Sequence, residues 1–360
     1  MSRLDWYILK KFFVTFFFCL IVITAIAIAV DSSEKTGSFL KAGLSRADVL
    51  REYYPAFVLY IWGLMFPIFV FIAVIFFTSR LAMQSEIIAI LASSVSYNRF
   101  LKPYLIGGII LALLLWLGNR SFIPHANAVR SKFHENEFFG NENYSGCFNC
   151  FYRRTDTNTF VAIKDFNPDV MIAYGFSLQK LKEEKVIYNL RSDIIRWDTV
   201  KKIWKARNVK ERIVNSMGET IHQYDSLIID LNLKPEELKR DEFLKDKLTS
   251  SQLKAYIKLE EMRGTEGLNT LKVEHYRRTA TAYAVLLLTM MGAVIASRKT
   301  RGGSGLHIAI GIVIAAFFVL SDKFSTVFAI KGNFPPLIAA WLPNLVFTFI
   351  AGLFYRLTPK

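Results

Sequence analysis

Two cysteines and four histidines are the residues of the central polar segment that have the chemistry for metal or redox sites. Cys147 and Cys150 form a Cys-x-x-Cys motif, and a local disulfide is its favoured state in an oxidising compartment. Free thiols are the second alternative and a zinc site the third, because no second ligand pair lies nearby. The histidines, which have no metal-ligand spacing, are His125, His134, His222 and His275. The pattern therefore predicts a possible disulfide at Cys147 and Cys150 and no metal site.

The nearest approach to a nucleotide-binding loop is the glycine-rich piece Arg301-Gly302-Gly303-Ser304-Gly305. It lacks the lysine of a phosphate-binding loop and no strand precedes it, so a turn between two helices is the better interpretation. Neither a Gly-x-Ser-x-Gly nor a His-Glu-x-x-His motif occurs in the sequence, and these motifs carry hydrolase and protease chemistry. We therefore predict that the chain is not an enzyme, needs no cofactor and is driven by a partner.

A single acidic residue, Glu86, stands in the segment that separates the second and third apolar runs. Residues 80–95 predict a short helix, which carries one apolar face. That face consists of Met83, Ile87, Ile90 and Leu91. Two interpretations fit this pattern. The helix lies at the membrane interface with an exposed glutamate, or it inserts into a cytosolic ATPase, where Glu86 meets a basic partner.

The apolar residues are concentrated in blocks that are long enough to cross a bilayer. They make up 52% of the chain although 21% of it is charged, and a membrane helix needs about 20 apolar residues. Six such runs occur, at residues 12–30, 55–77, 104–123, 279–297, 304–321 and 337–355. The fold class predicted is an α-helical membrane protein with six spans, three on each side of a polar insert.

Loop charges predict the orientation. One set of short loops and flanks carries eleven basic residues and two acids, whereas the opposite loops, 31–54 and 322–336, carry six and five. Basic loops face the cytoplasm, so both termini are predicted there and the insert outside. Residues 120–276, which contain the insert, have a net charge of only +3 of the total +15. Because the excess lies at helix ends, we predict no nucleic-acid partner.

The insert is predicted to be all-β. Strand-like runs occur at 159–163, 170–174, 186–190, 194–197, 203–209 and 226–231, at the spacing typical of a β-roll or sandwich. Residues 249–262 then predict a helix, and a short helix at about 270–278 leads into the fourth span. The predicted domains are 1–123, 124–276 and 277–360.

The whole plan resembles the lipopolysaccharide-export permease family LptF/LptG, whose members place a periplasmic β-jellyroll between two sets of three spans. Shorter segments agree in order and position. They are Ser85-Glu86-Ile87-Ile88-Ala89-Ile90-Leu91, Ser250-Ser251-Gln252-Leu253, Glu274-His275-Tyr276-Arg277-Arg278, Phe334-Pro335-Pro336 and Ala340-Trp341-Leu342-Pro343-Asn344. The C-terminal segments are more similar to LptG than to LptF. The family's Gly-Ile-Ser turn after the cytoplasmic helix is replaced by Ser94-Val95-Ser96.

The resemblance implies a mechanism and a set of partners. Members of the family form a heterodimeric permease, here with an LptF-like second subunit, on two copies of an LptB-like ATPase in the bacterial inner membrane. Lipopolysaccharide enters from the outer leaflet and is passed to LptC-like and LptA-like periplasmic proteins. The segment Glu86, Ile87, Ile90 and Leu91 then corresponds to the coupling helix that contacts the ATPase.

The resemblance also suggests substrate-binding residues. Lys35 and Lys41 match the position of basic residues that the family uses for its substrate, where cationic side chains can meet lipid A phosphates. The alternative is a pair of solvated loop lysines beside Asp31 and Glu34. Residues of the first and fifth spans are expected to line the lipid cavity, and the candidates are Phe13, Phe17, Ile310, Ile314 and Phe317.

Two other functions fit the same features. The chain is alternatively a membrane-anchored binding or scaffold protein that transports nothing, or a permease for another lipid or a lipoprotein with a different ATPase. Co-purification with a small cytosolic ATPase separates transport from the scaffold function.

Overall fold

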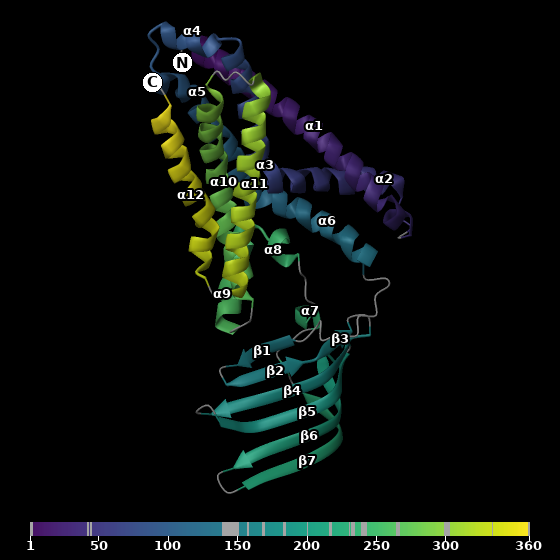
Figure 1. Ribbon diagram of the computed structural model, residues 1–360. Helices are drawn as coiled ribbons and strands as arrows, with labels where there is room; N and C mark the ends of the chain where they lie inside the picture. Colours follow the sequence, from purple (N-terminus) through teal and green to yellow (C-terminus); the bar gives the residue numbers. More distant parts are fainter. Residues whose placement is uncertain are drawn as a thin grey trace. The chain divides into compact units, whose positions relative to one another are not determined.

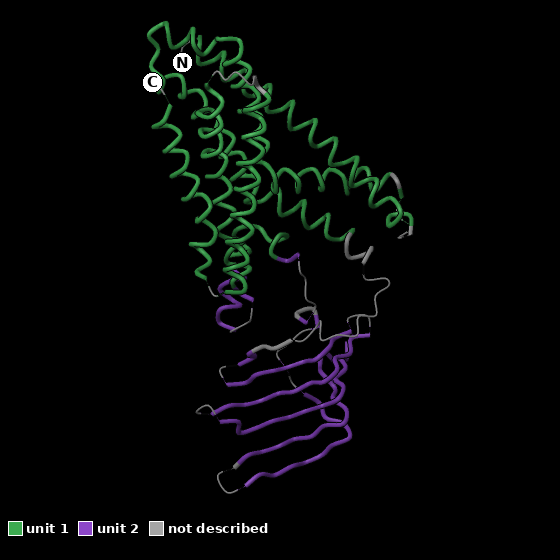
Figure 2. Tube along the Cα trace, viewed as in Figure 1, with its two compact units in different colours: residues 1–140, 245–254, 269–360 green, residues 141–244, 255–268 purple. Residues whose placement is uncertain are grey.

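The computed structural model divides the chain into two compact units (Figure 2). The first consists of residues 1–140, 245–254 and 269–360, and the second of residues 141–244 and 255–268. The structure describes residues 3–358 except 42, 44, 139–150, 157, 168–169, 183–184, 200, 216–217, 230, 232–234, 239–242, 264–266, 299–302 and 333.

Six helices in the described part of the first unit are long and apolar enough to cross a membrane. Each contains most or all of one predicted apolar run, and Figure 1 labels them all. They are α1 (Arg3–Lys41), α3 (Tyr54–Met83), α5 (Tyr97–Leu117), α10 (Leu268–Ala296), α11 (Gly303–Lys331) and α12 (Pro336–Leu357). The prediction of three spans on each side of an insert is confirmed.

The first helix is longer than its apolar run. With 39 residues at about 1.5 Å each, α1 is nearly twice as long as the roughly 30 Å hydrocarbon core is thick. The prediction that residues 31–54 form a loop is therefore wrong for most of its length. An ion pair between Asp31 and Lys35, one helical turn apart, supports the extension. After it come the short helix α2 (Arg46–Asp48) and the π-helical turn η1 (Val49–Tyr53).

The predicted helix at 80–95 is two elements. Residues 80–83 complete α3, the chain turns through Ser85, which has a φ of 59°, and α4 (Glu86–Ala92) begins. A left-handed residue cannot continue a right-handed helix, which is why the pattern breaks there. Beyond α5, the π-helical turn η2 (Gly118–Phe122) and α6 (Ile123–Phe138) follow.

The predicted helix 249–262 is present as α9 (Ser250–Arg263). Its start is a reciprocal cap, in which the Gln252 amide donates to Thr249 Oγ1 over 3.4 Å and the Thr249 amide donates to Gln252 Oε1 over 3.0 Å. The predicted apolar positions Leu253 and Ile257 are buried, but Leu259 is exposed. The short helix at 270–278 is not separate, because it forms the first part of α10.

The insert contains one antiparallel sheet of seven strands, so the all-β prediction is confirmed. The neighbours in the sheet are β1-β2-β4-β5-β6-β7, and β3 pairs with β4. The strands are β1 (Phe151–Asp156), β2 (Thr159–Ile163), β3 (Asp165–Asn167), β4 (Ile172–Lys182), β5 (Lys185–Asp198), β6 (Ile203–Asn215) and β7 (Gly218–Ile229). Short helices α7 (Pro235–Leu238) and α8 (Leu244–Lys247) follow.

Three details of the strand prediction are wrong. The runs 186–190 and 194–197 are one strand, β5, because Arg191 and Ser192 continue the ladder opposite Lys210 and Val209. The run 170–174 overlaps β4 only in its last three residues, and β1 and β3 have no counterpart among the predicted runs. The centre of the sheet core is Trp204 on β6, which is fully buried and packs edge-on against Trp197 and Phe166.

The core of the membrane unit depends on a close approach between α1 and α5. Phe12 on α1 is fully buried and lies over Gly107 of α5, where a Cβ atom would come within 2.5 Å of the phenyl ring. The glycine therefore sets the distance between the two helices, as small residues do in membrane helix packing.

Replacing Gly107 with alanine is expected to lower the stability of the protein by about 1–3 kcal/mol, because the buried Phe12 ring must move. The matched control is Gly352→Ala in α12, where a Cβ atom meets nothing within 4 Å. The midpoint of thermal unfolding in detergent measures both. Equal midpoints for Gly107→Ala and Gly352→Ala would contradict the packing described.

Candidate functional site

The short helix α4 has one buried face and one exposed face. Ile87 is 2% exposed and belongs to the core of the membrane unit, against which Ile90 and Leu91 also pack. Ile88 is 52% exposed, and Ala89 and Ala92 are exposed beside it. The surface that α4 offers to a partner therefore consists of Ile88, Ala89 and Ala92. Of the predicted apolar face, Ile87, Ile90 and Leu91 pack inward, whereas Met83 at the end of α3 is 39% exposed.

Glu86 is held by the first turns of α1. Tyr7 donates a hydrogen bond from its hydroxyl to Glu86 Oε2 over 3.0 Å, and Lys11 Nζ lies 3.4 Å from Glu86 Oε1. Lys11 also donates to the Tyr7 hydroxyl. The side chains of Glu86 and Lys11 remain about one third exposed (31% and 38%), so this pair is worth less than about 1 kcal/mol. We call Tyr7, Lys11 and Glu86 the α1–α4 link.

A residue with a left-handed backbone conformation lies on each side of α4. Ser85 precedes it, and Ser94 follows it with a φ of 66°. A non-glycine residue costs roughly 1–2 kcal/mol in this conformation, whereas glycine is free of the penalty. Ser94 takes the place of the glycine in the Gly-Ile-Ser turn described above. It nevertheless adopts the left-handed backbone conformation that favours glycine.

Lys35 is not a solvated loop residue. It lies on α1 with a side chain that is 21% exposed, and its Nζ donates to the Tyr53 hydroxyl over 2.7 Å and lies 3.3 Å from Asp31 Oδ1. Tyr53 in turn donates to Asp31 Oδ1 over 3.2 Å. The cation therefore faces a carboxylate of its own helix. Lys41 ends α1, and its side chain lies outside the described residues, as do Cys147 and Cys150.

The predicted lipid-facing residues lie on the two spanning helices that are least buried. Only 17% of the apolar window of α1 and 22% of that of α11 is buried, compared with 67% for α10. Phe17, Ile310 and Phe317 are exposed, by 50%, 39% and 62%. Phe13 and Ile314 are partly buried against the core. Both helices therefore carry broad apolar faces that the described residues leave uncovered.

A group of charged residues lies in the first part of α10, within the segment Glu274-His275-Tyr276-Arg277-Arg278 that resembles the family. Glu274 pairs with Arg277 over 2.7 Å and with Arg278 over 3.5 Å. These pairs are three and four residues apart, a spacing visible in the sequence. What the sequence did not show is that Arg278 is only 7% exposed.

Arg278 fixes the segment in which the chain returns from the insert to the membrane unit. Its guanidinium donates to the carbonyl of Lys245 over 2.9 Å and to Ser250 Oγ over 3.2 Å. Burial raises the pKa of the neighbouring Asp246, and the carboxylate of Glu274 raises it further, against the attraction of Lys245, Arg277 and Arg278. Among the described residues no group of three His, Cys, Asp or Glu side chains can hold a metal.

Comparison with protein families gives one match. The family model for the lipopolysaccharide export system permease LptF/LptG matches residues 6–357, which is nearly the whole chain. The model describes both branches of the family together. No curated protein matches the sequence.

Replacing Asp246 with asparagine is expected to stabilise the protein at pH 7. A carboxyl group with a raised folded pKa binds its proton more tightly when folded, so its ionisation costs stability as the pH rises above about 4. The gain of Asp246→Asn over the natural chain should therefore shrink as the pH is lowered from 7 towards 4. Thermal unfolding midpoints over this range provide the measurement, and a gain that grows on acidification would contradict the assignment.

Proposed function

This chain belongs to the lipopolysaccharide export permease family LptF/LptG, and we propose that it is one permease subunit of an ATP-driven exporter. In this proposal the chain takes lipopolysaccharide from the outer leaflet of the inner membrane and passes it to a periplasmic bridge. The match over residues 6–357 carries the proposal, because it includes the six spans and the inserted sheet together. The family is a permease component, so the chain is a multi-pass membrane protein whose role is transport.

We infer the partners from the missing phosphate-binding loop and from the exposed apolar surfaces. The sequence holds no complete phosphate-binding loop, so ATP hydrolysis belongs to an LptB-like dimer on the cytoplasmic side. The exposed residues Ile88, Ala89 and Ala92 of α4 form the contact with that ATPase. An LptF-like second permease, with this chain as the LptG-like subunit, would cover part of the bare apolar faces of α1 and α11. LptC-like and LptA-like proteins would then receive the lipid from the insert.

The proposed route of force runs through α1. The α1–α4 link joins the ATPase-contacting helix to the N-terminal turns of α1. The same helix carries Phe13, Phe17 and, near its other end, Lys35. Because an α-helix transmits displacement along its axis, movement of α4 would reach the lipid-facing part of α1.

A lipid phosphate that binds Lys35 must compete with the carboxylate of Asp31. Lys35 is already paired with Asp31, so binding a lipid A phosphate means exchanging one anion for another. A doubly charged phosphate with three acceptor oxygens is the stronger partner. The site as proposed is therefore a lysine held in position by Asp31 and Tyr53 until the lipid arrives.

Ile88→Ser is expected to reduce the amount of ATPase that co-purifies with the chain, because it removes an exposed apolar side chain at the proposed contact. Glu86→Ala should do the same if the carboxylate meets the ATPase directly. Lys11→Ala is the matched control, since it removes the ion pair of the α1–α4 link and leaves the surface of α4 intact. Quantitative pull-down measures all three, and normal ATPase recovery with Ile88→Ser would contradict the proposed contact.

Lys35→Gln is expected to lower photo-crosslinking of lipopolysaccharide to α1, whereas Asp31→Asn should maintain or raise it by releasing the cation from its internal partner. Lys254→Gln on α9, an exposed lysine away from α1, is the control. If Lys35→Gln and Lys254→Gln crosslink equally well, Lys35 serves only to support its helix. If Lys35→Gln lowers crosslinking of a phospholipid probe but not that of lipopolysaccharide, the transported lipid would be a different one.

A further inference from the structure

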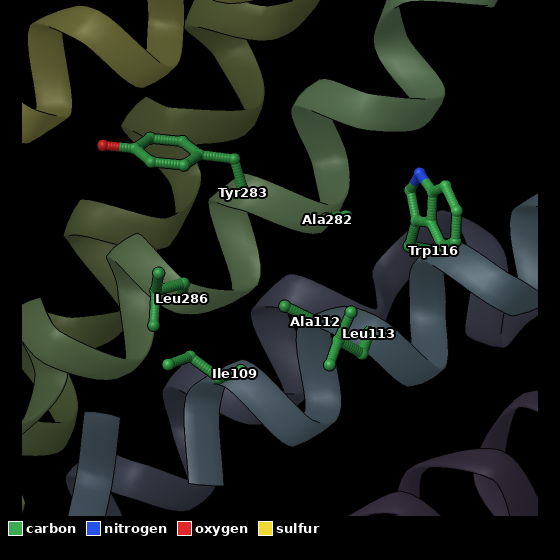
Figure 3. Close-up of a pocket in the computed structure, with 7 residues that line it drawn as sticks. All are labelled: Ile109, Ala112, Leu113, Trp116, Ala282, Tyr283 and Leu286. Atoms are coloured by element: carbon green, nitrogen blue, oxygen red, sulfur yellow. The ribbon is translucent and has the colours of Figure 1, made fainter. Parts of the chain in front are cut away.

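An apolar trough lies between α5 and α10, away from every residue discussed above as a substrate contact. Figure 3 shows the residues that line it, which come from these two helices. They are Ile109, Ala112, Leu113, Trp116, Ala282, Tyr283 and Leu286. Its volume of about 360 Å³ lies within the range of roughly 300–1,000 Å³ that small-molecule sites have. Neither α1 nor α11 contributes to its walls.

Two contacts with α10 flank the trough, one from α5 and one from η2. At one end Gly108 lies against Leu286 and Thr289, where an added Cβ atom would come within 3.1 Å of Leu286. At the other end Asn119 donates to Thr281 Oγ1 over 3.4 Å. Between these contacts the alanines at 112 and 282 leave the space open. The trough is therefore formed by residues of α5 and α10 alone.

The rim of the trough has the polarity of a membrane interface. Trp116 lies at the C-terminal end of α5, about 30 Å of helix from its start, which is the thickness of the hydrocarbon core. Tryptophan is enriched at that depth. One turn further on, the exposed guanidinium of Arg120 lies 5.8 Å from the centre of the Trp116 ring. Arg120 makes no ion pair with any described residue.

We propose that this trough binds one acyl chain of a membrane glycerophospholipid, with the headgroup phosphate at Arg120. The walls are apolar along their length, and the cation stands at the end where a phosphate would lie. Tyr283 is held by α12, because its hydroxyl lies 3.0 Å from Thr348 Oγ1 and its ring lies 5.6 Å from that of Trp341, so it forms a positioned part of the trough wall. The proposal rests on the membrane location of the chain and is independent of what the chain transports.

A partner helix fits the trough less well than a lipid does. Lining residues on α5 run from Ile109 to Trp116, which spans about 10 Å at 1.5 Å per residue. A spanning helix would need an apolar face across about 30 Å. A single acyl chain can lie in a short trough and continue into the surrounding lipid.

The test is native mass spectrometry of the full-length chain titrated with phosphatidylglycerol in mixed micelles. The natural chain is expected to retain one phosphatidylglycerol. Arg120→Gln should bind it about tenfold more weakly, the loss of one charge-assisted contact. Leu113→Trp should also weaken binding, because Leu113 is 54% exposed at the trough and a larger ring can fill the space without disturbing the core.

Two controls match these variants. Arg99→Gln removes an exposed arginine at the opposite end of α5, and Leu345→Trp enlarges an exposed leucine of α12. Both should bind phosphatidylglycerol as the natural chain does. Unchanged affinity in Arg120→Gln and Leu113→Trp, or equal losses in the controls, would overturn the proposal. Displacement of the bound lipid by an equimolar amount of lipopolysaccharide would also overturn it, because the trough would then be a substrate site.

Discussion

Hydrocarbon supplies no hydrogen-bond partners, and this constraint organises the membrane unit. Each backbone amide inside the bilayer must be satisfied within its own segment, so the spans are continuous helices. Several polar side chains among them are also paired, although Asn344 Oδ1 is buried without a hydrogen-bond partner among the described residues. Thr78 donates to the hydroxyl of Tyr104 over 3.0 Å, and Trp62 donates to Thr24 Oγ1 over 2.9 Å. Asn344 donates to the carbonyl of Ala280 over 2.8 Å. Charged groups are left for the helix ends, where the candidate sites are found.

Because α1 is long, it connects two of these candidate sites. A helix that only crossed the membrane would stop near the end of its apolar run at residue 30. Here it continues to Lys41, so one rigid element carries the α1–α4 link near its first turn and the Asp31–Lys35–Tyr53 group near its last. Both groups are paired internally. The Lys11–Glu86 pair is about one third exposed and therefore weak, whereas Asp31 and Lys35 are largely buried. In the exporter that we propose, this helix would connect the end that contacts the ATPase to the end that contacts the lipid.

The sequence was sufficient for the plan of the fold and insufficient for the surfaces. Hydropathy gave six spans and the β-rich runs gave an all-β insert, because both signals are carried by many residues. The end of α1 was missed because hydropathy does not register a helix that continues through Asp31 and Glu34. The break at Ser85 was missed because serine carries no signal for a left-handed backbone. At α4 the apolar period identified Ile87, which is buried, whereas the exposed Ile88 has no periodic signature.

The small residues of α5 show why such surfaces need coordinates. Gly107 receives the ring of Phe12 from α1, and Gly108, next along the chain, receives Leu286 and Thr289 from α10. Ala112 lies one turn later on the same helix and lines the trough together with Ala282 of α10. From the sequence alone, these three residues of α5 cannot be distinguished, because each is a small side chain in a spanning helix. Whether a small residue closes a helix contact or opens a trough depends on what the neighbouring helix places opposite it.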